Sequence, residues 1–330
     1  MYKITIIPGD GIGHEVMEGA KLILDKLDLN LSIEECEAGF DCFKKNGTTL
    51  PEETLKKSKS SDAVLFGATT STPNEKSPIL TLRKELETYG NLRPVKSFKG
   101  VPSIKKGLDF LIVRENTEGL YSQIEKISDD GNESCALRII TKKASEKIAE
   151  LAFKECINRN YKKVTCVHKS NVLKKTDGIF KDSFYKIASK YPNIKSNDYY
   201  VDATAMYLIS KPQEFDVIVT SNLFGDILSD EAAGLVGGLG FAPSANIGDK
   251  YGLFEPVHGS APDIAGKNIS NPTAMILSVK MMLNYLNEFD LSNNLKTAIE
   301  KTLEDKKTLT PDLGGVNTTL EMSKAISNNL

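Results

Sequence analysis

Residues 219–240 read VTSNLFGDILSDEAAGLVGGLG. Apolar, β-favouring residues lead up to Val219 and a turn follows at Ser221-Asn222, so a strand is expected here with a helix after it. On that helix Asp226 and Asp230 are four residues apart, which puts their Cβ atoms about 5–6 Å apart on one face. Carboxylates this close favour a bound cation, and hard oxygen ligands suit Mg²⁺ or Mn²⁺. A solvated acidic face is the alternative.

The composition is that of a globular protein with two domains. The chain has 330 residues, of which 40% are hydrophobic and 26% charged, and this length exceeds one ordinary core. The net charge of −2 provides no overall attraction to nucleic acid or to an anionic membrane. Five cysteines without a Cys-x-x-Cys motif indicate a reducing cytoplasm. We expect neither a membrane-spanning segment nor a signal peptide.

The first residues approach a dinucleotide-binding motif without completing it. A strand over residues 2–7 leads into the turn PGDGIG at residues 8–13, and a helix follows. The Rossmann fingerprint requires Gly-x-Gly-x-x-Gly, and here His14 stands in place of the last glycine. A nucleotide site at this turn therefore needs support of another kind.

Apolar strands alternate with amphipathic helices along the chain, which predicts an α/β fold. Strands are expected over 29–37, 62–66, 108–113 and 163–168, helices over 51–58, 78–87 and 145–159, and a hairpin return over 131–141. Residues 242–249 and 252–266 show neither the helical nor the strand periodicity of apolar residues. A long irregular stretch in a compact domain is usually functional. Thr318 and Glu321 form a capping box for the last helix.

Three arginines lie close to the ends of these elements. Arg83 is on the expected helix over 78–87, Arg93 precedes a proline, and Arg114 follows an apolar strand. Guanidinium groups bind carboxylates in a bidentate way, so the three indicate an anionic substrate. Ordinary surface ion pairs are the alternative for each of them.

Three ordered motifs resemble a known family. They are the stretch over 222–240, the segment EPVHGSAPDIAG over 255–266, and Arg83-x₉-Arg93-Pro. Together they resemble the β-decarboxylating dehydrogenases, the isocitrate/isopropylmalate dehydrogenase family, over essentially the whole chain. The resemblance implies a two-domain α/β fold that is not Rossmann, with a mixed sheet flanked by helices. Domain 1, on the cofactor side, would comprise residues 1–88 and 237–330, and domain 2 residues 89–236 with the substrate and metal side and a dimer interface.

The resemblance also implies roles for the residues that match family motifs. Arg83, Arg93 and Arg114 would clamp the malate part of the substrate. Tyr121 would donate a proton, and Lys169 with Asp202 would act as the base, supplied by the second subunit of a homodimer. The implied metal ligands are Asp226, Asp230 and the partner's Asp202. The implied cofactor contacts are Thr69, Thr70, Glu255, His258, Gly259, Ser260, Ala261, Asp263, Ile264 and Asn271.

The implied reaction is the metal-dependent oxidative decarboxylation of a 2-hydroxy acid that bears a 3-carboxylate, with hydride transfer to NAD. Asp263 is informative about the cofactor, because an aspartate there in NAD-using relatives accepts the adenosine ribose hydroxyls and repels a 2′-phosphate. NADP-using relatives carry Lys-Tyr in place of Asp263-Ile264. We therefore expect NAD.

The turn before Arg83 reads the third substituent of the substrate in this family. Ile79 and Leu80 match the apolar part of the isopropylmalate pattern, whereas Ser77 lies where isocitrate enzymes contact a third carboxylate. With Lys76 included, the sequence of this turn resembles most that of methanogen homoisocitrate dehydrogenases. We therefore expect homoisocitrate, in the 2-oxo acid chain elongation that leads to coenzyme B. The alternatives are 3-isopropylmalate, in leucine biosynthesis, and then isocitrate.

A non-catalytic regulatory subunit is the alternative from another class. It predicts that a metal aspartate, the lysine or the tyrosine is missing, and every matching position is occupied here. A nucleotide-binding protein without redox chemistry would leave the three arginines, Tyr121 and Lys169 unexplained.

Overall fold

The computed structural model describes residues 1–330 and divides into two compact units. Unit 1 comprises Met1–Thr88, Ser97–Lys106 and Val236–Leu330, and unit 2 comprises Tyr89–Lys96 and Gly107–Leu235. The sequence analysis placed residues 97–106 in the middle domain, but the structure places them in unit 1. There Phe98 packs against Phe241, with ring centroids 5.8 Å apart. This contact joins residues far apart in the chain, so local sequence patterns do not reveal it.

Unit 1 is built on five strands in the order β2-β1-β3-β12-β11. They are β1 (Tyr2–Gly9), β2 (Leu31–Glu35), β3 (Ala63–Ala68), β11 (Pro243–Ile247) and β12 (Gly252–Pro256). Neighbouring strands pair in parallel except β11 and β12, which are antiparallel. Every residue of β3 is buried, as expected of a parallel strand that is covered on both faces.

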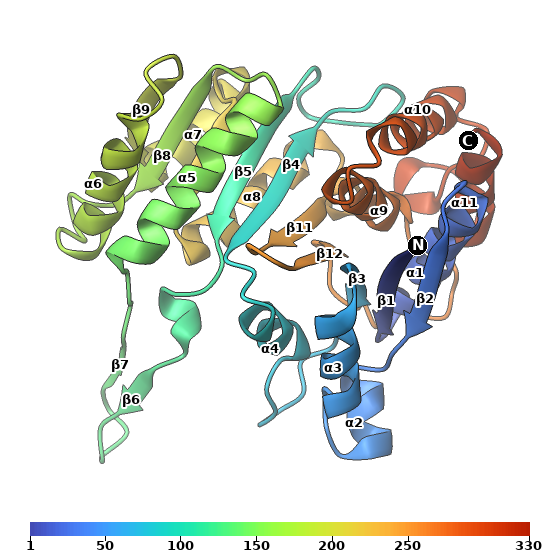
Figure 1. Ribbon diagram of the computed structural model, residues 1–330, viewed down its shortest axis with the longest axis horizontal. Helices are drawn as coiled ribbons and strands as arrows, with labels where there is room; N and C mark the ends of the chain where they lie inside the picture. The colour runs from blue at the N-terminus through green and yellow to red at the C-terminus, as the bar shows by residue number, and fades with distance from the viewer. The chain divides into compact units, whose positions relative to one another are not determined.

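Helices pack on both faces of the unit 1 sheet (Figure 1). Its helices are α1 (Ile12–Lys26), α2 (Phe40–Asn46), α3 (Glu52–Ser60), α4 (Pro78–Glu85), α9 (Thr273–Tyr285), α10 (Phe289–Asp305) and α11 (Thr319–Asn328). The helices α1 and α9 pack against β3, and α10 and α11 pack on them in turn. Val64 and Phe66 of β3 form a second core with Leu82 of α4. The expected capping box of Thr318 and Glu321 is present at the start of α11.

Unit 2 also has a five-stranded sheet, in the order β4-β5-β10-β8-β9. Its strands are β4 (Gly90–Lys96), β5 (Asp109–Glu115), β8 (Lys163–His168), β9 (Lys195–Tyr200) and β10 (Val217–Thr220), and its helices are α5 (Lys142–Asn158), α6 (Thr176–Ala188), α7 (Val201–Ser210) and α8 (Asn222–Val236). Only β4 and β5 pair antiparallel. The carboxyl ends of β5, β8 and β10 therefore meet at one edge of the sheet, where ligand-binding loops of α/β proteins gather.

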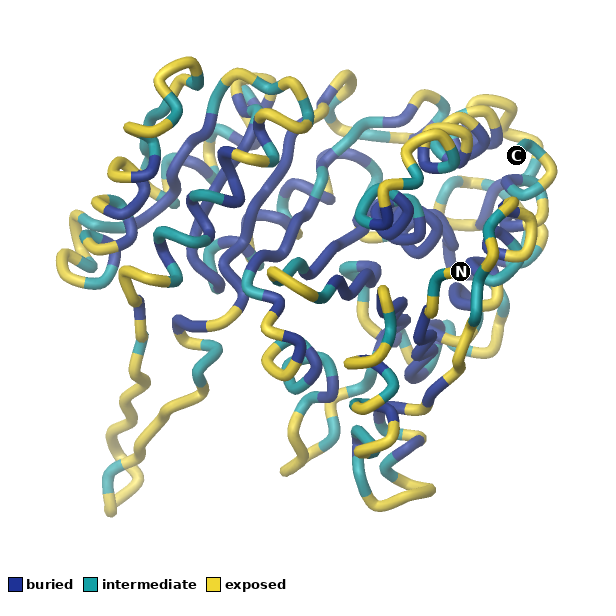
Figure 2. Tube along the Cα trace, viewed as in Figure 1, coloured by how far each residue is buried: buried dark blue, intermediate teal, exposed yellow.

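An arm extends from unit 2. It is the two-stranded sheet of β6 (Glu125–Ile127) and β7 (Ser134–Ala136), and all six residues of these strands are exposed (Figure 2). This agrees with the hairpin return expected over residues 131–141. Because a two-stranded hairpin is marginally stable alone, an arm of this kind gains most from a partner surface.

Two strands lie where irregular chain was expected. The loop expected over residues 242–249 contains β11, and the irregular segment over 252–266 begins with β12. Proline and glycine at the ends of these strands hide their pattern, while the pairing of Pro243 with Pro256 and of Ile247 with Gly252 joins them in register. No helix of the protein is both long and apolar enough to cross a lipid bilayer.

Candidate active site

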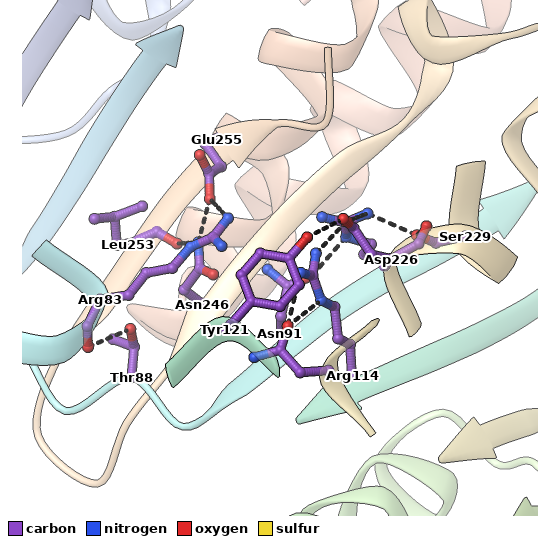
Figure 3. Close-up of polar contacts among 12 residues, drawn as sticks. Arg83, Thr88, Asn91, Arg114, Tyr121, Asp226, Ser229, Asn246, Leu253 and Glu255 are labelled. Carbon is purple, nitrogen blue, oxygen red and sulfur yellow. Dashed lines mark hydrogen bonds and ion pairs between the residues drawn. The ribbon is translucent and has the colours of Figure 1, made fainter. Parts of the chain in front are cut away.

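Two buried arginines, Arg93 and Arg114, contact one aspartate, Asp226, in unit 2, and Figure 3 shows the pair of Arg114 and Asp226. Arg93, on β4, lies 3.2 Å from Asp226 through Nη1, and Arg114, at the end of β5, makes a short ion pair with the same carboxylate. The two arginines are 6% and 2% exposed. Both guanidinium groups therefore converge from the protein interior on one carboxylate, which is 32% exposed, through charge-assisted hydrogen bonds.

Neighbouring polar groups set the orientation of the arginines. Arg93 donates through Nε to Asn91 at 2.7 Å and through Nη1 to Ser229 at 2.6 Å. Arg114 donates through Nε and Nη2 to Asn222, at 3.1 and 2.8 Å. The sequence analysis selected none of these three partners. Asn91 could have been found, because residues two apart on a strand share a face.

Gly225 lets Arg114 lie across the start of α8. A Cβ atom on Gly225 would approach Cγ of Arg114 to 2.6 Å and Cβ to 2.7 Å, closer than carbon atoms pack. Any side chain at this position would displace the arginine. The glycine in the Asn222–Val236 helix is thus explained by close packing, despite its unfavourable helix propensity.

Asp226 and Asp230 are the candidate metal ligands. Their carboxylates face the same side of α8, since Nη1 of Arg93 lies 3.2 Å from one and 3.4 Å from the other. Two carboxylates on one helix face supply the hard oxygen ligands that Mg²⁺ or Mn²⁺ prefers, so the pair fits a divalent cation. No group of three or more His, Cys, Asp or Glu side chains in the chain could hold an ion, so Asp202 does not complete the set within one chain.

Tyr121 contacts the same cluster from the short helix η1 (Leu120–Ser122). Its hydroxyl donates to Oδ2 of Asp226 at 2.5 Å, and the Arg114 guanidinium lies 5.0 Å from its ring centroid. Burial and the hydrogen bond to Asp226 raise the pKa of Tyr121 against the effect of Arg114. The phenol therefore keeps its proton at neutral pH, as a general acid requires.

Lys169 and Asp202 form a separate charged pair in unit 2. Lys169 directly follows β8 and Asp202 lies in the first turn of α7. Lys169 Nζ donates to Oδ1 of Asp202 at 2.5 Å, and this hydrogen bond lowers the pKa of the Asp202 carboxyl. The amine and the carboxylate are joined directly, so the Asp202 carboxylate holds the Lys169 side chain in position.

Arg83 lies in a buried network of unit 1 (Figure 3). Its Nη2 donates to Oε1 of Glu255 at 2.7 Å, and Asn246 donates to the same oxygen at 2.7 Å. Nε of Arg83 is buried without a hydrogen-bond partner, which leaves a donor for a further acceptor. The structure thus pairs Arg83 and Glu255, which the sequence analysis assigned to substrate and cofactor respectively. Neither Asn246 nor the pairing was foreseen.

Asp10 holds together the segments of unit 1 that are expected to bind the cofactor. Its carboxylate accepts backbone N–H groups of Phe40, Asp41 and Thr70 at 2.8, 2.9 and 2.7 Å. The hydroxyl groups of Thr70 and Ser260 are 2.8 Å apart. The turn that failed the Rossmann fingerprint therefore organises the Thr70 loop and the segment after β12. An aspartate flanked by glycines was the available signal, and it was overlooked.

The glycines of this turn permit close backbone packing. Gly9 and Gly11 have φ values of 80° and 58°, which L side chains rarely adopt. A Cβ atom on Gly11 would lie 2.1 Å from the carbonyl oxygen of Ser260, and Ile12 N–H donates to that oxygen at 2.9 Å. The glycines thus allow the backbone of the turn at residues 8–13 to contact the backbone at Ser260.

The segment between β12 and α9 carries the other expected cofactor residues: Gly259, Ala261, Asp263, Ile264 and Asn271. His258 has a buried Nε2 without a hydrogen-bond partner, and burial lowers the pKa of its ring. A neutral ring with an unused nitrogen is suited to a polar ligand. Asn271 donates to Asp312 at 3.0 Å, and Asp263 has an exposed side chain.

The turn before Arg83 presents its residues differently. Lys76 is exposed, and Ser77 is the N-cap of α4 but makes no side-chain capping bond. Ile79 packs against the core that contains Val64 and Phe66. Leu80 is half-buried and precedes Arg83 by three residues, so both occupy one face of α4. Ile79 precedes Arg83 by four residues and is also its neighbour, but Ile79 packs against the core, so Leu80 is the apolar neighbour of the arginine outside that core.

The fold and these clusters can be compared with known proteins. The model of the isocitrate/isopropylmalate dehydrogenase family matches residues 3–326. The chain belongs to this family. It is accordingly an enzyme, a dehydrogenase of a divalent-metal-dependent class that carries out oxidative decarboxylation. The regulatory-subunit alternative is not supported.

Individual relatives match along nearly their whole length. The 3-isopropylmalate dehydrogenase of Methanothermobacter thermautotrophicus is 57% identical, with 99% of this chain and 98% of the relative covered. In Methanocaldococcus jannaschii, a 3-isopropylmalate/3-methylmalate dehydrogenase is 54% identical (99% and 98% covered) and a homoisocitrate dehydrogenase 49% (99% and 97%). The crystal structure of isocitrate dehydrogenase from Methylococcus capsulatus has a TM-score of 0.97 at 42% identity, with 100% and 99% covered.

Proposed function

We propose that this dehydrogenase oxidises and decarboxylates a 3-substituted malate, with 3-isopropylmalate as preferred substrate and NAD as hydride acceptor. The observation that carries the substrate is the order of the relatives, since those named for 3-isopropylmalate, at 57% and 54% identity, precede the one named for homoisocitrate, at 49%. The sequence analysis preferred homoisocitrate, and the comparisons favour its alternative.

The geometry of α4 supports the same substrate. Leu80 shares the face of Arg83, whereas Lys76 is exposed and lies before the helix begins. An apolar side chain beside a carboxylate-binding arginine suits a malate with a branched apolar substituent. Homoisocitrate remains the second candidate, because Lys76 and Ser77 would favour a substituent that ends in a carboxylate.

In the proposed mechanism the arginines bind the substrate carboxylates and the base removes a proton. Arg93 and Arg114 present buried forks, and Arg83 has an unused Nε donor. Lys169 would accept the hydroxyl proton, and the Asp202 carboxylate, 2.5 Å away, would hold the Lys169 side chain in position. Hydride leaves the carbon that bears this hydroxyl, and the resulting β-keto acid then loses CO₂. Tyr121, protonated at neutral pH, would donate its proton to the carbon that carried the carboxylate.

Asp226 and Asp230 would hold the divalent cation, Mg²⁺ or Mn²⁺. When bound, the cation supplies Lewis acidity at the substrate oxygens and the nicotinamide accepts the hydride. The exposed Asp263 would accept hydroxyl groups of the adenosine ribose and would repel a 2′-phosphate, which favours NAD over NADP. All five cysteines are free thiols, which agrees with a reducing cytoplasm as the location.

The experiment that tests the function is a steady-state assay with Mg²⁺ and NAD⁺. We expect kcat/KM to be highest for 3-isopropylmalate, ahead of homoisocitrate, isocitrate and D-malate, and to fall when NADP⁺ replaces NAD⁺. A preference for homoisocitrate would return the assignment to Lys76 and Ser77. Activity with none of the four substrates would refute the proposed function.

Leu80→Ser sharpens this assay. It should lower kcat/KM for 3-isopropylmalate by about tenfold or more, since a few methylene groups of pocket contact are worth about that. The value for D-malate, which has no substituent to bind, should change little. Ile79→Ser is the matched control, because Ile79 packs in the core and its loss affects stability rather than the ratio of the two substrates. An unchanged ratio in Leu80→Ser would remove Leu80 from substrate selection.

We further propose a homodimer with shared active sites. One chain supplies Asp226 and Asp230 for a metal but no third acidic ligand beside them. Large apolar side chains are exposed on the arm of unit 2 and close in sequence to Lys169, Asp202 and Asp226. They are Ile127 70%, Val172 66%, Met206 56%, Ile209 50% and Ile227 58%. A second copy that covers these residues would bring its Lys169 and Asp202 to the first copy's metal ligands.

Mixed dimers test this sharing. Lys169→Ala and Asp230→Asn should each be inactive alone, but subunits exchanged between them should recover about a quarter of the wild-type activity, because half of the dimers then contain one intact site out of two. Lys169→Ala mixed with Asp202→Asn is the control, since both changes lie on the same side of every site and no site is restored. Recovery in both mixtures, or in neither, would contradict shared sites.

A further inference from the structure

The segment Arg138–Thr141, between the arm and α5, contacts three elements of unit 2 that the mechanism uses. Neither the sequence analysis nor the proposed mechanism assigns it a role. The three elements are the turn at Lys169, the start of α8, and the loop that carries Tyr121. The contacts are hydrogen bonds, together with one ion pair of Arg138.

Towards the base, the contact runs through Asp177. The Asp177 carboxylate accepts the backbone N–H of Lys169 at 2.6 Å and makes a short ion pair with Arg138. Asp177 is 1% exposed and the Arg138 side chain 13%. A charge this deeply buried needs its partner, so the position of Asp177, and with it the backbone of Lys169, depends on Arg138. Arg138 also donates to Thr176 at 2.9 Å.

Towards the metal ligands, Arg138 reaches the turn before α8. Its Nη2 donates to Oγ of Ser221 at 3.1 Å, and its guanidinium lies 5.3 Å from the ring centroid of Phe224. Ser221 is 4% exposed and immediately precedes the helix that presents Asp226. One guanidinium therefore connects the base turn to the metal-ligand helix, and it does so with different nitrogens.

Towards the proton donor, the backbone of the segment pairs with the Tyr121 loop. Gly119 N–H donates to the carbonyl of Ile139 at 2.8 Å in an isolated β-bridge. Thr141 donates to the Glu118 carboxylate through its backbone N–H at 2.8 Å and its hydroxyl at 2.9 Å. These bonds fix the residues just before Tyr121.

We propose that Arg138 and Asp177 are positioning residues for the reaction, and that the buried Arg138 fork holds the Lys169 turn in a set position relative to the start of α8. The inference rests on the proposed roles of Lys169 and Asp226. If the sites are shared in a dimer, this fork connects the base of one active site with the metal ligands of the other.

Arg138→Lys is the sharpest test. A lysine keeps the charge opposite Asp177, but its single ammonium cannot also reach Ser221 with the geometry of a planar fork. We expect kcat to fall by about 10–100-fold with a smaller change in KM, because a displacement of about 1 Å at a catalytic group costs rate. The isotope effect on hydride transfer with 2-deuterated substrate should rise. Amide hydrogen exchange should increase in both segments, around Lys169 and around Ser221.

Two further variants separate the links. Ser221→Ala removes only the link to α8, so it should raise exchange at the start of α8 and leave the Lys169 segment unchanged. Arg159→Lys makes the same chemical change in the Arg159–Glu155 pair of α5, at 3.1 Å, and should change neither rate nor exchange. The inference would be overturned if the wild type is active, the Arg138→Lys variant is equally active, and amide hydrogen exchange around Lys169 and Ser221 is unchanged. A wild type without dehydrogenase activity would instead refute the proposed function, while the exchange pattern would still decide whether the fork couples the two segments.

Discussion

Lys169→Met should fold and bind cofactor normally but lose about 1,000-fold in kcat, since a positioned general base is worth about 10²–10⁴ in rate. Methionine preserves the length and apolar stem of the side chain while removing the amine. The hydroxyl proton then loses its proposed acceptor, the Lys169 amine, which Asp202 holds at 2.5 Å in the wild type. The measurement is kcat with the preferred substrate, alongside calorimetric titration of NAD and the thermal unfolding midpoint.

Lys186→Met is the matched control for this variant. Lys186 also belongs to unit 2 and pairs with a carboxylate, Glu146, at 2.9 Å, but it lies on α6 and is not expected to contact substrate. Its rate should remain at the wild-type level. If Lys169→Met retained near-native kcat, Lys169 could not be the base, and the proton would have to leave by another route.

Asp226→Asn should abolish activity and also destabilise the protein by about 2 kcal/mol, between the cost of breaking a buried ion pair and an exposed one, since the Asp226 side chain is 32% exposed while both arginines are buried. The two effects have different causes. The neutral amide is a poorer ligand for a divalent cation. It also removes the carboxylate shared by Arg93 and Arg114, which are 6% and 2% exposed and would stay charged. The free energy of unfolding in urea, measured without metal, isolates the second effect.

Asp230→Asn separates the two roles. Asp230 is 53% exposed, and Nη1 of Arg93 lies 3.4 Å from it. Its replacement should also abolish activity through the metal, yet change the free energy of unfolding by less than about 1 kcal/mol, as is usual for exposed pairs. Equal destabilisation by the two variants would show that Asp226 has no special part in neutralising the arginines.

Several parts of the site could be predicted because their geometry is local. The four-residue spacing of Asp226 and Asp230 places both carboxylates on one face of α8, and both lie beside Arg93. Arg114 lies at the end of the buried strand β5, and Lys169 directly follows the buried strand β8. Parallel strands bring such ends to one edge of a sheet. The motifs also placed the chain in its family.

Other parts could not be predicted because they depend on contacts between distant residues. The strands β11 and β12 become recognisable only when they pair with each other, since proline and glycine mask their local pattern. Arg83 and Glu255 are 172 positions apart, and their ion pair exists only because α4 and β12 lie together. The sequence alone also drew the expected substrate preference towards Lys76, which the structure leaves exposed.

The order of residues by itself therefore determined the α/β class, the family, and which side chains are proposed to carry the chemistry, because periodicity and motif spacing act over a few residues. Only the tertiary structure decided which of these charged groups neutralise one another, that Asp10 organises the glycine-rich turn, and that Arg138 connects the turn at Lys169 to the start of α8. The physical reason is that a buried charge must find its partner wherever the fold places one, and that partner is seldom a neighbour in the chain.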